Sequence, residues 1–143
     1  MPGGSCSWKA YARERQIAAT NFLEGFGTTQ TGGTRSTELV PTVTLDWLAA
    51  HFPPPDVLKI DVEAAEVLVL YGGEAVLARQ PAIICEVDDV NAARVAELLD
   101  RYGYALYDGE RPAEARHALD RAPATLLALP QHVSDRRPWT NVG

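Results

Sequence analysis

The sequence has little cysteine, lysine or histidine, and it has no long apolar run. Among its 143 residues are two cysteines, Cys6 and Cys85, too few for a disulfide framework or for a cysteine-based metal cage. No apolar stretch approaches the ~20 residues that span a bilayer, and the start Met1-Pro-Gly-Gly lacks the apolar core of a signal peptide. We therefore expect a cytoplasmic protein in a reducing compartment.

Positive charge is also scarce. Acidic residues outnumber basic ones by 19 to 13, which gives a net charge of −6 and a pI near 5.0. This balance argues against nucleic acid or an anionic membrane as the main partner. The only lysines are Lys9 and Lys59. With 46% hydrophobic and 22% charged residues, the chain can bury a core as one globular domain.

The chain divides into three parts by composition. Residues 1–39 form an irregular segment with a candidate strand over 16–22 and a Gly- and Thr-rich loop over 25–36. Residues 40–130 carry clear alternation and helical periodicity, and residues 131–143 are expected to form a tail. We expect the middle part to hold the folded α/β unit.

Strands and helices alternate along that middle part. Thr44 is a candidate N-cap for a helix over 45–52, which must stop at Pro53. A second helical segment over 63–79 is interrupted by Gly72-Gly73, and a third begins after Asn91 as its N-cap and ends at Gly103. Strands are predicted at 40–44, 57–61, 82–87, 104–108 and 125–129, with a short helix within 110–122. This order predicts a layered α/β sheet with helices on both faces.

Acidic side chains follow two of the predicted strands. Asp61 and Glu63 come at the end of the strand over 57–61, and Glu86 lies near the end of the next strand. If these strands are neighbours, the three carboxylates meet at one rim of the sheet, where ligands gather in such folds. Their repulsion requires a raised pKa or a cation between them. Such a rim suits a general base, a hydroxyl-binding site or Mg²⁺.

Some of these residues also have a purely structural interpretation. Glu63 and Glu66 would favour the positive N-terminal end of the following helix. Cys85, within Ile83-Ile84-Cys85, is expected to be a small buried apolar residue.

One ordered set of motifs resembles a known family. Thr44-Leu45-Asp46, a proline-rich turn, the run Lys-Ile-Asp-Val-Glu-Ala-Ala-Glu over 59–66, Val69-Leu70, Gly72 and Pro81 to Val87 occur in sequence. Together they resemble the FkbM family of S-adenosylmethionine-dependent methyltransferases.

The resemblance implies a fold, an activity and a set of site residues. The fold is a class I methyltransferase (Rossmann-like) sheet with a reversed last strand, in which 104–108 and 125–129 form the final antiparallel pair. The activity is O-methylation of a hydroxyl on a small molecule or a sugar, with S-adenosylmethionine as cofactor. Asp61 would orient or deprotonate the acceptor hydroxyl, and Glu63 or Glu86 would assist. We expect no metal at this site.

Two departures from the family pattern stand out. Ala64 replaces the glycine of the hallmark; because alanine favours helices, we expect the helix to persist there. A glycine-rich cofactor turn is also missing: the only candidate, over 22–27, has no helix after it, and Gly25 lies 36 residues before Asp61. Two further βαβ units of about 30 residues cannot fit in that interval. We therefore expect a truncated, carboxyl-terminal half of a methyltransferase sheet, without its first strands and with weak or no activity alone.

Two alternatives to a competent methyltransferase remain open. The chain is either a non-catalytic half-fold that acts as a binding or assembly module, as a homodimer that covers its free sheet edge, or a metal-dependent enzyme. No histidine lies near the acids in sequence, which disfavours the metal hypothesis. Arg35, in the loop over 25–36, is a candidate substrate contact.

Overall fold

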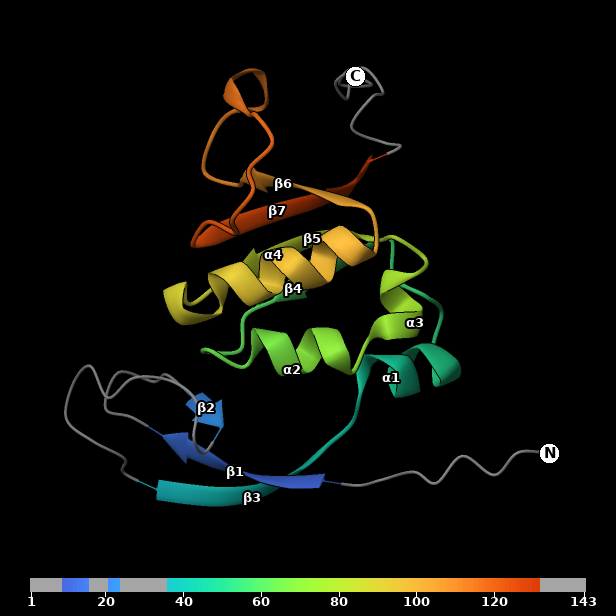
Figure 1. Cartoon of the computed structure of the whole chain (residues 1–143). Coiled ribbons are helices and arrows are strands. Elements are labelled where there is room, and N and C mark those ends of the chain that lie inside the picture. The colour runs from blue at the N-terminus through green and yellow to red at the C-terminus, as the bar shows by residue number, and fades with distance from the viewer. Residues whose placement is uncertain (1–8, 16–20, 24–35, 132–143) are drawn as a thin grey trace, which may run out of the picture.

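The computed structural model describes residues 9–15, 21–23 and 36–131, which form two separate β-sheets with helices (Figure 1). The first sheet is antiparallel with the order β2-β1-β3, from β1 (Lys9–Arg15), β2 (Asn21–Leu23) and β3 (Ser36–Thr42). Strand β1 has no counterpart in the sequence prediction, and β3 starts four residues before the strand expected at 40–44. Of the strand expected at 16–22, residues 16–20 lie outside the described residues.

The second sheet has four strands in the order β4-β5-β7-β6. They are β4 (Val57–Ile60), β5 (Ala82–Glu86), β6 (Tyr104–Asp108) and β7 (Thr125–Pro130). Strands β4 and β5 are parallel, whereas β7 runs antiparallel to both β5 and β6. The four strands and the reversed last strand are confirmed.

Four helices connect or precede these strands. They are α1 (Leu45–His51), α2 (Glu66–Tyr71), α3 (Glu74–Leu77) and α4 (Ala92–Arg101). Two single-turn 3₁₀ segments, η1 (Asp89–Asn91) and η2 (Ala113–Ala115), complete the list. Thr44 caps α1 as predicted, because its hydroxyl accepts a hydrogen bond from Trp47 N at 3.1 Å. The helix expected within 110–122 is reduced to η2.

Gly72 and Gly73 divide the predicted second helix into α2 and α3, as expected. The break lets α1 approach closely, since a Cβ on Gly73 would lie 2.8 Å from Leu45 Cδ1. Asp46 of α1 then caps α3, because its two carboxylate oxygens accept hydrogen bonds from Ala75 N and Val76 N, each at 3.1 Å. The Thr-Leu-Asp motif of the sequence is thus a structural clamp between α1 and α3.

The helices between the strands of the second sheet lie on one of its faces. Both parallel connections, β4 to β5 and β5 to β6, step across the sheet in the same direction, and right-handed crossovers then place α2, α3 and α4 on the same side. The expectation of helices on both faces is therefore wrong for the part of the chain that the structure describes. The buried core fills the space between this face and the helices; its fully buried large side chains include Leu70, Leu77, Ile83, Val95, Leu99 and Leu126.

The opposite face of the sheet is more exposed. Side chains alternate along each strand, so Val57 and Ile84 point away from the helices, with 56% and 41% of their surface exposed. Two-sided burial is the rule for parallel strands, and β4 and β5 depart from it here. No helix within the described ranges is long and apolar enough to cross a membrane.

Substitution of Gly73 by alanine should destabilise the protein. The added methyl group would overlap Leu45, and we expect a loss of about 1–3 kcal/mol in the free energy of unfolding, measured by urea denaturation. Gly72→Ala is the matched control, because its nearest neighbour, Thr44 Cβ, lies at 3.3 Å and a smaller loss should follow. Equal losses in the two variants would contradict the close approach of α1.

Removal of the Asp46 cap should also lower stability. Asp46→Ala leaves two backbone N–H groups of α3 without an acceptor, which costs about 1 kcal/mol. Asp46→Asn keeps one acceptor oxygen and should cost less. Thermal and urea unfolding of the two variants measure the difference; an unchanged midpoint in Asp46→Ala would contradict the role of the cap.

Candidate functional site

Parallel pairing of β4 and β5 brings two carboxylates to the same end of the sheet. The register pairs Ile60 with Cys85, so Asp61 and Glu86 follow directly on neighbouring strands. In parallel sheets this end is the usual place for ligands. We call Asp61, Glu63 and Glu86, together with Lys59, the acidic rim.

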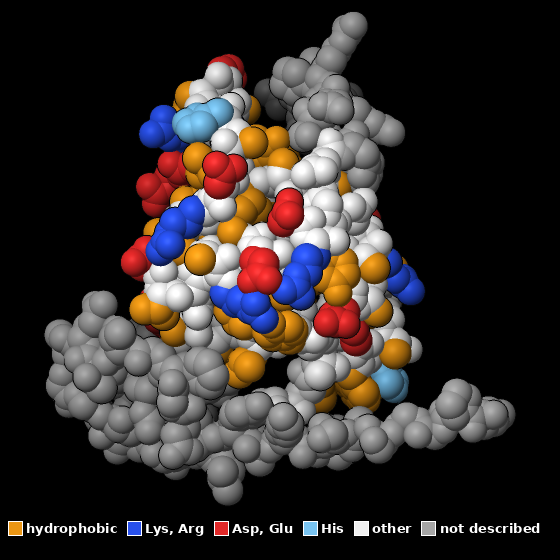
Figure 2. Space-filling model, viewed as in Figure 1, with side chains coloured by type: hydrophobic (Ala, Val, Ile, Leu, Met, Phe, Trp, Pro, Cys, Tyr) orange, Lys and Arg blue, Asp and Glu red, His pale blue; other side chains and the backbone are white. Residues whose placement is uncertain are grey.

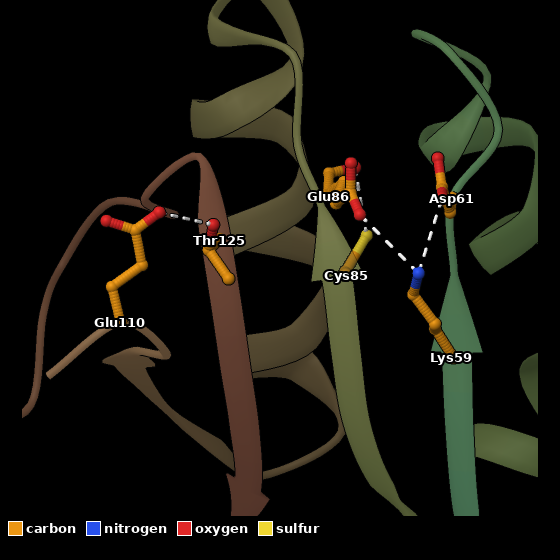
Figure 3. A network of polar contacts seen from close by, with 6 residues as sticks. All are labelled: Lys59, Asp61, Cys85, Glu86, Glu110 and Thr125. Atoms are coloured by element: carbon orange, nitrogen blue, oxygen red, sulfur yellow. Dashed lines mark hydrogen bonds and ion pairs between the residues drawn. The ribbon is translucent and has the colours of Figure 1, made fainter. Parts of the chain in front are cut away.

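Lys59 lies between the two strand ends. Figure 3 shows its side chain reaching along β4 toward both acids; Lys59 Nζ lies 3.3 Å from Asp61 Oδ2 and 3.5 Å from Glu86 Oε1. The hydrogen bond and the charge of Asp61, followed by the charge of Glu86, raise the pKa of the Lys59 ammonium. A cation between the acids was one of the two outcomes predicted for close carboxylates, but Lys59 was not among the predicted site residues. One signal in the sequence could have identified Lys59: it is two residues before Asp61 along a strand, so the two side chains lie on the same face.

The surroundings of Glu63 change the pKa of its carboxyl. Desolvation, followed by the negative charges of Asp61 and Glu86, raises the pKa of the Glu63 carboxyl. Its side chain is exposed, and it makes no hydrogen bond to any residue in the described part of the chain. Both consequences expected of close carboxylates, a raised pKa and an intervening cation, are therefore present at the rim.

The segment that carries Glu63 is a left-handed turn, not the start of a helix. Glu63 has φ = 47° and Ala64 has φ = 69°, values that only glycine adopts without strain. Helix α2 consequently begins at Glu66, and the expectation of a helix from Glu63 through Ala64 is wrong. The φ angle of Ala64 gives a physical reason for glycine at this position of the hallmark.

Glu66 is buried beneath this turn, with 1% of its surface exposed. Glu66 Oε1 accepts a hydrogen bond from Ala64 N at 2.8 Å, and Oε2 accepts one from Asn91 Nδ2 at 2.7 Å. Glu66 is also the first residue of α2, so its interpretation as a favourable charge at the helix N-terminus agrees with its position. Asn91 precedes α4 as predicted, but its side chain does not cap that helix, because it bonds to Glu66 and to Ala64 O.

Cys85 lies next to the rim but faces the core. It is buried as expected, with 1% of its surface exposed, and burial raises the pKa of its thiol to about 12. Its Sγ donates to Glu86 O at 3.5 Å. A thiol in this state is not a nucleophile at neutral pH.

The alternative of a metal-dependent enzyme finds no support at the rim. Within the described ranges, no group of three or more His, Cys, Asp or Glu side chains is arranged to hold a metal ion. The ammonium of Lys59 already supplies the positive charge between Asp61 and Glu86.

The acidic rim is separate from the cavity beside α4. A cavity of about 570 Å³ lies between α4, β6 and residues 118–121, and no rim residue lines it. Figure 2 shows acidic and basic side chains interspersed over the face that carries α4. Of the candidate cofactor turn over 22–27, residues 22 and 23 belong to β2 and residues 24–27 lie outside the described residues, as does Arg35.

Comparison with known proteins identifies the family. The model of the FkbM methyltransferase domain matches residues 2–106, so the match extends through the N-terminal segment, well before the hallmark at 59–66. A search of curated proteins and a search of solved structures gave no match. Since the family model covers well over half of the sequence and includes the acidic rim, the chain belongs to the FkbM methyltransferase family.

Proposed function

We propose that this chain carries the acceptor side of an S-adenosylmethionine-dependent O-methyltransferase, with the acidic rim as the place where the acceptor hydroxyl is held. The observation that carries the proposal is the convergence of Asp61 and Glu86 on Lys59 at the carboxyl ends of two parallel strands. Membership of a methyltransferase family supplies the reaction class.

The chemistry of the rim fits the charged part of the cofactor. The cofactor carries a positively charged sulfonium, and the rim offers the carboxylates of Asp61, Glu63 and Glu86 against the single ammonium of Lys59. Desolvation, followed by the negative charges of Asp61 and Glu86, raises the pKa of the Glu63 carboxyl. Asp61 and Glu63 are the residues that would face the sulfonium. When bound, S-adenosylmethionine supplies the methyl carbon, whose bond to sulfur breaks with its electron pair left on sulfur as the bond to the acceptor oxygen forms.

The residues of the rim have two tasks in this reaction. Asp61, held by Lys59, is proposed to accept a hydrogen bond from the acceptor hydroxyl and so orient its oxygen. The hydroxyl proton passes to a rim carboxylate and from there to water. Glu86, which shares Lys59 with Asp61, keeps the ammonium between the strands.

The charge of the rim also selects the acceptor class. Carboxylate oxygens only accept hydrogen bonds when ionised, so they favour donors such as hydroxyl groups. An anionic acceptor would be repelled by three carboxylates. A neutral acceptor with several hydroxyl groups, such as a sugar or a hydroxylated small molecule, therefore fits the rim best.

Calorimetry with S-adenosylmethionine tests the proposal directly. Wild-type protein should bind it more tightly than S-adenosylhomocysteine, which lacks the positive charge. Removal of one rim charge in Asp61→Asn should reduce this preference about fivefold, which corresponds to the loss of one solvent-exposed charge interaction of about 1 kcal/mol. Methyl transfer to a panel of glucose, glycerol and catechol, followed by mass spectrometry, tests the reaction.

Glu97→Gln is the matched control for the binding experiment. Glu97 lies on α4, is paired with Arg94 and Arg101, and is not part of the rim. This variant should keep the preference for the charged cofactor. Absence of binding at millimolar S-adenosylmethionine would contradict the proposal for this chain.

The exposed sheet face favours a second candidate function, a dimeric binding or assembly module. Val57 and Ile84 are exposed apolar residues on neighbouring strands, and β4 is an edge strand of its four-stranded sheet. Unpaired edges and apolar faces promote association with a second chain. Under this proposal, two copies associate through β4 and this face.

Light scattering coupled to size-exclusion chromatography tests the second candidate. Wild-type protein should elute as a dimer, and Ile84→Lys should shift it to a monomer, because a charge would then have to be buried in the interface. Val90→Lys, at an exposed residue of η1, is the matched control and should leave the dimer intact. A monomeric wild-type protein would contradict this candidate.

A further inference from the structure

The turn between β4 and α2 is strained, and buried or partly buried side chains hold it in place by hydrogen bonds. Two consecutive non-glycine residues, Glu63 and Ala64, adopt left-handed φ angles, which persist only where surrounding contacts impose them. The contacts come from Glu66 and Asn91. We call these two side chains the latch.

The latch binds both backbone polar groups of Ala64, the N–H and the carbonyl oxygen. Glu66 Oε1 accepts from Ala64 N at 2.8 Å, and Asn91 Nδ2 donates to Ala64 O at 2.8 Å. Asn91 Nδ2 also donates to Glu66 Oε2 at 2.7 Å, which closes a ring of three hydrogen bonds. Glu66 is almost fully buried, and Asn91 is partly buried. In such surroundings, hydrogen bonds to a charged group are stronger than in water.

The latch also joins the two strand ends that make the rim. Glu66 begins α2, which follows β4, whereas Asn91 ends η1, which follows β5. The Asn91 side chain therefore ties the loop that carries Asp61 and Glu63 to the loop that follows Glu86. Movement of either loop would break hydrogen bonds that a buried carboxylate requires.

The residue that the latch positions is Glu63, the rim acid that forms no ion pair with any residue in the described part of the chain. Asp61 and Glu86 are both engaged by Lys59, whereas Glu63 makes no hydrogen bond within the described part of the chain and is exposed to an incoming ligand. Asp61 and Glu86 each have an oxygen occupied by the Lys59 ammonium, whereas no described residue occupies the carboxylate oxygens of Glu63.

We propose that Glu66 and Asn91 are positioning residues that hold Glu63 at the acidic rim, and that Glu63 takes the proton of the acceptor hydroxyl while Asp61 orients that hydroxyl. The assignment to Glu63 rests on the proposed methyltransferase function; the positioning by the latch does not. In the reaction, the O–H bond of the acceptor breaks as the Glu63 carboxylate takes the proton. The acceptor oxygen keeps the electron pair and uses it for the bond to the methyl carbon. Glu63 then releases the proton to water.

The charges around Glu63 agree with this role. Desolvation, followed by the negative charges of Asp61, Glu86, Glu66 and Asp88, raises the pKa of its carboxyl. The cation of the rim, Lys59, is engaged by Asp61 and Glu86. A base must be ionised to act, so the rate of methyl transfer should rise with pH through the pKa of Glu63.

Titration of the apoprotein by NMR tests the latch without any activity. With glutamate labelled with ¹³C at Cδ, the Glu63 signal is assigned by its loss in Glu63→Gln. Asn91→Ala should release the turn, move Glu63 away from the other acids into water, and lower its pKa by a measurable shift. Val90→Ala, at the exposed neighbour of Asn91, is the matched control and should leave the titration unchanged.

A second variant keeps the test decisive if Asn91→Ala folds poorly. Ala64→Gly removes the strain of the left-handed turn and should raise the denaturation midpoint by itself. In the Ala64→Gly background, Asn91→Ala should lower the midpoint less than it does in the wild-type background. Equal losses in both backgrounds would contradict the role of the latch in holding the turn.

The possible outcomes distinguish a failure of the positioning role of the latch from a failure of the proposed function. An unchanged Glu63 titration in folded Asn91→Ala overturns the positioning by the latch, whatever the activity. Full methyl transfer to the hydroxyl panel by Glu63→Gln, with loss in Asp61→Asn, overturns Glu63 as the proton acceptor and leaves the methyltransferase function standing. If S-adenosylmethionine does not bind but the Glu63 titration shifts as expected in Asn91→Ala, the proposed function is overturned and the positioning role of the latch stands.

Discussion

The parallel hydrogen bonding between β4 and β5 is the constraint on which the candidate site depends. Its register brings Asp61 and Glu86 to adjacent strand ends, so two like charges lie side by side at the surface. The ammonium of Lys59, on the same strand face, lies within 3.5 Å of both acids and offsets this repulsion. Lys59, Asp61 and Glu86 are therefore an electrostatic unit whose geometry is set by backbone pairing.

The regular elements of the second sheet were predictable because each has a local cause. Short apolar runs identified the strands, Thr44 and the prolines bounded α1, and two consecutive glycines divided α2 from α3. Gly103, with φ = 72°, ends α4 where its lack of a side chain predicts. These signals lie within a few residues of the element that they control, so one sequence is enough to read them.

The turn after β4 was not predictable, because its cause is not local. Alanine favours a helix at position 64, and only hydrogen bonds from Glu66 and from Asn91, 27 residues away, select the left-handed conformation. The one-sided helical layer was missed for a similar reason. Which face a helix covers depends on the order of the strands in space, and the sequence pattern of a buried strand does not reveal that order.

The scarcity of lysine gives the rim a chemical property of its own. Lys59 is the one lysine between residues 36 and 131, and more than half of its side chain is exposed. An amine-directed reagent therefore has a single target in this part of the chain, and that target lies between Asp61 and Glu86. Because both acids stabilise the protonated amine, acylation there should be slow at neutral pH, and any molecule that occupies the rim should slow it further. The rate at which Lys59 is acylated thus reports whether a ligand occupies the rim, without any added label.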